Sequence, residues 1–131
     1  MTSSIECPDA KQRLVIALGD PAGIGMEVTL KALADPRRPA DMQIPLLVGC
    51  RASLQKTAQH LRLHSKDPFV DPDALTIEDL PVPGGPLEPG DSGARSGEAG
   101  FRWLSRAVEL VKQQQARALV TAPIAKHAWH Q

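Results

Sequence analysis

The chain has 131 residues, of which 42% are hydrophobic, and its 15 Lys and Arg balance its 15 Asp and Glu. The length fits one domain with its own core. Without a net positive charge or any tyrosine, the sequence argues against nucleic acid or an anionic membrane as a partner. It carries neither a signal peptide nor a bilayer-spanning apolar stretch, so we expect a cytoplasmic protein.

The first predicted elements are a strand and a helix. Residues 14–18 form a continuous apolar run, typical of a parallel strand covered on both faces. A helix is expected to begin at Ile24 and to end before Pro36. Its apolar stripe is predicted to contain Ile24, Val28 and Ala32, with Leu33 beside them. The residues before this region, 1–12, are predicted to form a disordered tail.

The next elements continue the alternation of strand and helix. A second apolar run covers residues 44–48, where Pro45 weakens the beginning of the strand. A helix is expected over residues 51–63, and a weak strand over 74–77. The core stripe of that helix is predicted to be Leu54, Ala58 and Leu61. This order predicts an α/β fold with a parallel sheet, flanking helices and right-handed crossovers.

Residues 78–95 are rich in proline and glycine and predict a long loop. Two interpretations remain open, because a loop of this length serves either as a flexible crossover or as a segment that closes over a ligand. The helix that follows is expected to have Ser96 as its N-cap and Glu98 in its first turn. Its sheet-facing stripe is predicted to be Phe101, Leu104, Val108 and Val111.

A last apolar run at residues 118–122 predicts a buried strand that ends at Pro123. The carboxyl ends of parallel strands carry the ligand sites of α/β proteins, so residues 121–126 are expected at that edge. Lys126 would there be able to pair with a phosphate or a carboxylate, although a simple surface lysine fits equally well.

The segment Gly19-Asp20-Pro21-Ala22-Gly23-Ile24-Gly25 joins the first strand to the first helix. Glycines permit positive φ and close approach of a ligand, and a helix N-terminus attracts phosphate. The spacing matches neither the dinucleotide fingerprint nor the P-loop. A phosphate or nucleotide site and a tight turn built for close packing therefore both remain open. Asp20 is expected mainly to stabilise the turn.

The four histidines support no metal site or catalytic triad. His60 and His64 are four residues apart on a predicted helix, but the local sequence supplies no third ligand. Solvated side chains are the favoured interpretation. The same holds for His127 and His130 near the end of the sequence. No catalytic residue and no metal ligand is assigned.

Three segments together carry a family resemblance. Gly19-Asp20-Pro21-Ala22-Gly23-Ile24-Gly25-Met26-Glu27, Ser96-Gly97-Glu98-Ala99-Gly100 and Val120-Thr121-Ala122-Pro123-Ile124-Ala125-Lys126 occur in this order. They resemble the G-[DE]-P-A-G-I-G-P-E start, a small-residue helix entry and the V-T-A-P-I-x-K strand end of the 4-hydroxythreonine-4-phosphate dehydrogenase family. One departure is Met26, where the family usually has proline.

The resemblance implies an isocitrate/isopropylmalate dehydrogenase-like fold and an enzyme of pyridoxal phosphate biosynthesis. Such an enzyme oxidises 4-phosphohydroxy-L-threonine with NAD or NADP, and the product then loses carbon dioxide. The family uses a divalent metal and works as a homodimer with its active site between two subdomains. Residues implied to bind cofactor or substrate are Asp20, Gly23, Gly25, Thr121 and Lys126.

The family's metal-binding histidines and its G-H/Q-T-E segment lie beyond the point that matches Gln131. Residues 13–131 are therefore expected to be the N-terminal α/β portion of a dehydrogenase, truncated before the metal-binding half, incomplete in fold and inactive alone. The alternatives are a non-catalytic fragment that binds a phosphometabolite or nucleotide, and a non-functional truncated copy.

Overall fold

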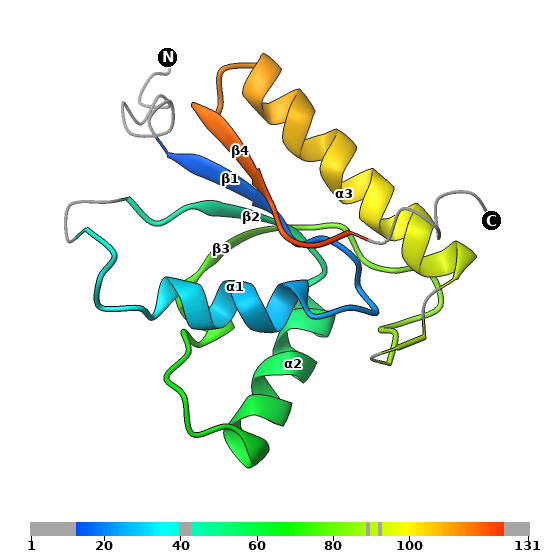
Figure 1. Ribbon diagram of the computed structural model, residues 1–131. Coiled ribbons are helices and arrows are strands. Elements are labelled where there is room, and N and C mark those ends of the chain that lie inside the picture. The colour runs from blue at the N-terminus through cyan, green and yellow to red at the C-terminus, as the bar shows by residue number, and fades with distance from the viewer. Residues whose placement is uncertain (1–12, 40–42, 89, 92, 125–131) are drawn as a thin grey trace.

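The computed structural model describes residues 13–39, 43–88, 90–91 and 93–124 (Figure 1). The predicted tail, residues 1–12, lies outside this part. Four parallel strands form one sheet in the order β3-β2-β1-β4. They are β1 (Leu14–Ala17), β2 (Leu46–Gly49), β3 (Thr76–Asp79) and β4 (Ala118–Thr121). The predicted α/β class with a parallel sheet is confirmed, and each strand lies within two residues of its expected place.

Helices cover both faces of the sheet. Figure 1 shows α1 (Gly25–Leu33) and α2 (Arg51–His64) on one face and α3 (Ala94–Lys112) on the other. A short 3-10 helix, η3 (Pro72–Ala74), precedes β3. The chain moves outward in the sheet from β1 through β2 to β3. It then crosses back over β2 and β1 and places β4 on the other side of β1. The two directions of travel use opposite faces, as they must if all crossovers have the same hand.

The predicted apolar stripe of α1 does not face the core, although the adjacent Leu33 does. Ile24 is 62% exposed and Val28 is 45% exposed, whereas Met26 and Leu30 are buried. The pair Ile24 and Val28 and the pair Met26 and Leu30 both have helical spacing, so periodicity alone does not predict which pair is buried. The choice is made at the helix start, where Gly25 packs against the backbone of Leu18 and fixes the rotation of the helix. By contrast, the predicted stripe of α2 is confirmed. Its buried members are Leu54, Ala58 and Leu61.

The helix α3 starts three residues earlier than predicted, with Gly93 rather than Ser96 as its N-cap. The Ser96 hydroxyl lies one turn inside the helix and exchanges hydrogen bonds with the Gly93 backbone, receiving one from its N–H at 2.8 Å and donating one to its carbonyl at 2.9 Å. A single serine therefore still stabilises this helix start, from a different position.

The predicted sheet-facing stripe of α3 is correct only for Leu104 and Val111, which pack against the core. Phe101 is 55% exposed and Val108 39% exposed, while Leu104 and Val111 are half-buried. The buried face consists mainly of small residues around Trp103. It contains Ser96, Gly97, Ala99, Gly100, Trp103, Ala107 and Leu110. Small side chains let the helix backbone come close to the sheet, so close approach prevails here over side-chain size.

The strand β4 is not the buried strand that its apolar sequence predicts. It pairs only with β1 among the described strands, and its side chains are half-buried or exposed. Val120 is 44% exposed. A run of apolar residues indicates a strand, but whether it is central depends on neighbours that lie elsewhere in the chain.

The 80–93 loop is anchored to the protein at a few points, although most of its described residues are exposed. Val82 and Leu87 are buried. The Trp103 indole N–H donates to the Leu80 carbonyl at 2.9 Å, and the Arg95 guanidinium donates to the carbonyls of Pro83 and Gly85 at 3.0 and 2.8 Å. These contacts favour a docked connection over a freely flexible crossover. No helix in the described part is long and apolar enough to span a membrane.

Candidate functional site at the carboxyl edge of the sheet

Three segments that are distant in sequence meet at the carboxyl edge of the sheet. The turn after β1 contacts the segment after β4, because the Asp20 N–H donates to the Pro123 carbonyl at 3.0 Å. The α3 helix approaches the same turn, since a Cβ added to Gly100 would lie 3.1 Å from the Gly19 carbonyl oxygen. The 80–93 loop joins them through Gly90, whose N–H donates to the Ala22 carbonyl at 2.7 Å.

This meeting point lies where the direction of the chain changes in the sheet. From β1 the chain proceeds to β2 on one side, whereas β4 pairs with β1 on the other side. In open α/β sheets, ligands bind outside the carboxyl ends of the strands at such a switch point. The glycine turn therefore occupies the position at which open α/β sheets commonly bind ligands.

Most glycines at this edge are explained by packing. Gly19 has φ +80°, and a Cβ there would lie only 2.2 Å from the Pro123 carbonyl oxygen. A Cβ at Gly25 would lie 2.4 Å from the Leu18 carbonyl oxygen. Both distances are far shorter than real contacts, so a side chain at either position would push the segments apart. The packing interpretation of the turn is thus correct for these two residues.

Gly23 differs from the other glycines of the turn. It is exposed, and a Cβ added there would make only ordinary contacts with Asp20, none nearer than 3.4 Å. Packing does not require a glycine at this position. The following helix start has no side-chain cap, since the N-cap residue is Ile24. Gly23 and the N-terminus of α1 are consequently the part of the turn that a negatively charged group can approach.

Asp20 has the turn-forming role that the sequence suggested. It is buried, and its Oδ1 accepts a hydrogen bond from the Ala22 N–H at 2.9 Å, while the Gly23 N–H bonds to the Asp20 carbonyl at 2.9 Å. These bonds fix the backbone of the turn.

Of the other two predicted site residues, the structure places one. Thr121 lies at the end of β4 in register with Ala17, exposed, and its hydroxyl bonds to the neighbouring Ala122 carbonyl at 3.0 Å. Lys126 lies outside the described residues. The sequence did not reveal the participation of Gly90. The only sequence feature that pointed to a role for this segment was the proline- and glycine-rich composition of the loop that contains Gly90.

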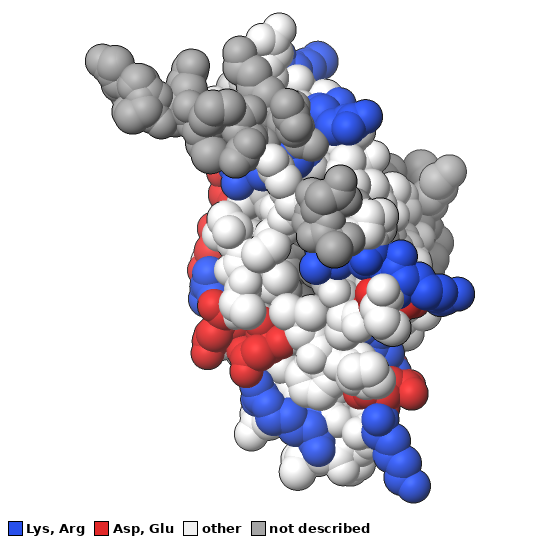
Figure 2. Space-filling view, turned by 90° about the vertical axis from the view of Figure 1, so that its left-hand side faces the viewer, with Lys and Arg blue, Asp and Glu red and all other residues white. Residues whose placement is uncertain are grey.

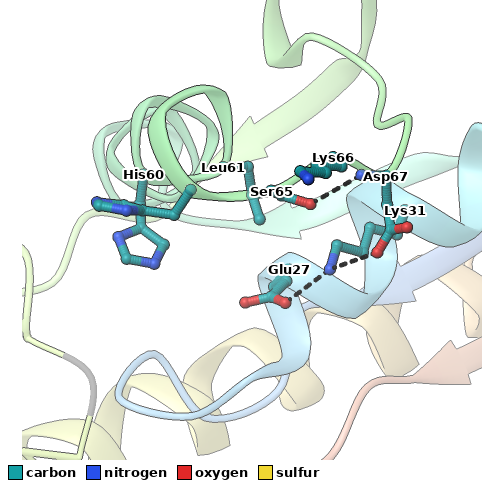
Figure 3. Close-up of a pocket in the computed structure, with 8 residues that line it drawn as sticks. Glu27, Lys31, His60, Leu61, Ser65, Lys66 and Asp67 are labelled. Carbon is teal, nitrogen blue, oxygen red and sulfur yellow. Dashed lines mark hydrogen bonds and ion pairs between the residues drawn. The ribbon is translucent and has the colours of Figure 1, made fainter.

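A second concave region lies between α1 and α2. This interhelical groove has a volume of about 320 Å³ and is lined by Glu27, Lys31, His60, Leu61, His64, Ser65, Lys66 and Asp67. Figure 3 shows Lys31 between Glu27 and Asp67, with its ammonium 3.0 and 3.4 Å from their carboxylates. The hydrogen bond from Lys31 to Glu27 is the main cause that raises the pKa of Lys31. On the face shown in Figure 2, acidic and basic side chains both occur beside uncharged areas.

The described residues contain no cluster of three or more His, Cys, Asp or Glu side chains arranged to hold a metal ion. His60 and His64 lie near each other in the interhelical groove, with ring centroids 4.6 Å apart. His127 and His130 lie outside the described part.

The fold defines a doubly wound α/β protein with a topological switch point between β1 and β4, where we place the candidate ligand site. Comparison with known families identifies it further. Residues 41–131 match the family described as pyridoxal phosphate biosynthetic protein PdxA, and the chain belongs to this family. The resemblance inferred from three short segments is confirmed.

The relatives are consistent with this assignment. A 4-hydroxythreonine-4-phosphate dehydrogenase of Synechococcus sp. (strain RCC307) is 54% identical over 119 residues, which are 91% of this chain and 35% of the relative. The crystal structure of such a dehydrogenase from Burkholderia phymatum has a TM-score of 0.75 at 28% identity, covering 91% of this chain and 38% of that one. The chain thus spans about a third of the length of the curated relatives it matches.

Proposed function

We propose that this chain is the N-terminal part of an NAD- or NADP-dependent dehydrogenase that oxidises 4-phosphohydroxy-L-threonine, with subsequent decarboxylation, in pyridoxal phosphate biosynthesis. The observation that carries the proposal is the meeting of three family-like segments at the switch point of the sheet. Family membership supports the dehydrogenase class. The whole enzyme is proposed to act in the cytoplasm as a homodimer.

The proposed binding residues divide into two roles. Gly23 and the N-terminus of α1 would receive a phosphate of the cofactor or substrate, aided by Thr121 at the end of β4 and by Lys126, which follows five residues later in the sequence. Asp20 and Gly25 would act indirectly, because Asp20 fixes the turn and Gly25 lets α1 start against the β1 strand end. A bound nicotinamide accepts the hydride from the substrate alcohol, and this chain's part is to hold and orient the reactants.

The divalent metal that the family implies does not fit the described residues, which lack a three-ligand cluster. We therefore assign no step of the reaction to a metal held by this chain. The chain alone is proposed to be inactive, since it spans about a third of its relatives.

The test is reconstitution. The chain would be mixed with the separately expressed remaining part of the Synechococcus relative, and reduction of NAD or NADP would be followed with 4-phosphohydroxy-L-threonine and added divalent metal. We expect turnover from the mixture and none from the chain alone. Gly23→Val and Lys126→Ala are expected to lower this turnover, whereas Ala32→Ser, at an exposed position of α1, is expected to leave it unchanged.

Turnover by the chain alone would refute the proposed inactivity. The alternative is a non-catalytic fragment that binds a phosphorylated metabolite or nucleotide, supported by the open approach at Gly23. Calorimetric binding of NAD or substrate without turnover in the mixture would favour it. Neither binding nor turnover would refute both and leave a non-functional truncated copy.

A further inference from the structure

The two histidines of the interhelical groove form a pair with defined geometry. His60 and His64 lie one turn apart in α2, and their rings are 4.6 Å apart between centroids at an interplanar angle of 41°. Both residues are exposed. Within the described part of the chain, neither imidazole has a hydrogen bond or ion pair, so the ring nitrogens are available for another ligand.

This pair has the chemistry of a chelating site. Histidines at positions i and i+4 of a helix place two imidazoles on one face, the spacing with which helices present them to zinc. Imidazole nitrogen suits copper, nickel and zinc, whereas magnesium and calcium prefer oxygen. Two protein ligands leave the remaining coordination positions to water.

The surroundings of the pair do not oppose a cation. The charged side chains that line the groove besides the histidines are Glu27, Asp67, Lys31 and Lys66, so two carboxylates balance two ammonium groups. Lys31 is further held by ion pairs with both carboxylates. Figure 3 shows His60 extending from α2 at the groove, with Glu27 on the neighbouring helix.

We propose that His60 and His64 together chelate a divalent transition-metal ion, and that the bound ion bridges these two side chains across the last turn of α2. The site consists of two imidazoles from this chain plus solvent. Because the ion binds the folded helix and not the dispersed histidines of an unfolded chain, it stabilises the native state by mass action.

The test measures metal binding and thermal stability in the full chain. The reference protein carries His127→Gln and His130→Gln, which remove the other histidines and should leave binding intact. Calorimetric titration is expected to give the order of affinity Cu²⁺, then Ni²⁺, then Mn²⁺, without binding of Mg²⁺. Excess Zn²⁺ is expected to raise the thermal midpoint of unfolding.

The matched control exchanges two neighbouring residues of α2. The double variant Gln59→His with His60→Gln keeps the composition but moves one imidazole around the helix, away from His64. Both positions are exposed, so folding should be unaffected. We expect Cu²⁺ affinity to fall roughly 100-fold, the loss expected when two linked contacts become one. Absence of Cu²⁺ binding in the reference protein, or equal affinity and an equal midpoint rise in the exchanged variant, would overturn the proposal.

Discussion

Substituting Gly19 by alanine tests the packing at the carboxyl edge. Gly19 has φ +80°, a conformation that costs a residue with a Cβ about 1–2 kcal/mol. The new Cβ would lie 2.2 Å from the Pro123 carbonyl oxygen, and such overpacking typically costs about 1–3 kcal/mol. The shift also threatens the hydrogen bond from Asp20 to Pro123, worth about 1 kcal/mol.

Alanine also reduces the conformational entropy of the unfolded chain, which stabilises the folded state by only about 0.4–1 kcal/mol. Gly19→Ala should therefore lower the free energy of unfolding by about 3 kcal/mol. Urea unfolding followed by tryptophan fluorescence and circular dichroism measures this, since Trp103 is fully buried. At typical slopes the midpoint should fall by roughly 1–3 M urea.

Gly23→Ala is the matched control for this experiment. The residue lies in the same turn, but its added Cβ would meet nothing nearer than 3.4 Å. We expect a change within about 0.5 kcal/mol. Equal destabilisation by the two variants would refute the argument that close backbone packing, rather than glycine content, shapes this turn.

Three further predictions follow from other parts of the molecule. Arg95→Gln removes the donors to two loop carbonyls and should speed limited proteolysis within residues 80–91 several-fold; unchanged cleavage would show that Arg95 does not hold the loop. Val120 is 44% exposed in β4, and Val120→Lys should slow aggregation in light scattering while changing the free energy of unfolding by no more than about 0.5 kcal/mol. Unaltered aggregation would show that the molecules do not associate through β4. The hydrogen bond from the Arg37 side chain lowers the pKa of Asp35 from 3.8 to about 2, so its contribution to stability is present above pH 4 and is lost as the pH falls toward 2. In NMR titration Arg37→Ala should return this pKa toward 3.8, and an unmoved midpoint would reject the assigned cause.

The sequence predicted which elements form better than which way they face. The strands β1 and β2 are continuous apolar runs, and such runs have few alternatives in an α/β protein. The helix α3, however, has two rows at helical spacing. The row through Phe101 and Val108 is the more apolar, yet the row through Gly100 and Trp103 packs on the sheet. Periodicity measures hydrophobicity, whereas burial also depends on how closely two backbones approach.

At the candidate site, too, the sequence predicts part of the arrangement and leaves part of it open. Parallel topology places the ends of β1 and β4 together, so the meeting of their following segments could be expected from the sequence. The partner of each glycine could not, because Gly19 and Gly25 contact backbone atoms that are set by the three-dimensional path of the chain. Gly23, the residue open to a ligand, has no local sequence feature that separates it from its neighbours.

The segments at the carboxyl edge are joined by main-chain hydrogen bonds, from Asp20 to Pro123 and from Gly90 to Ala22. Because such bonds do not depend on side-chain identity, many substitutions in these loops would preserve them. An inserted or deleted residue, in contrast, displaces the following backbone by up to about 3.8 Å and breaks the alignment of amide and carbonyl. For redesign of this edge, loop length and the two closely packed glycines, Gly19 and Gly25, are therefore the features to hold fixed, whereas the side chains at the other loop positions can vary.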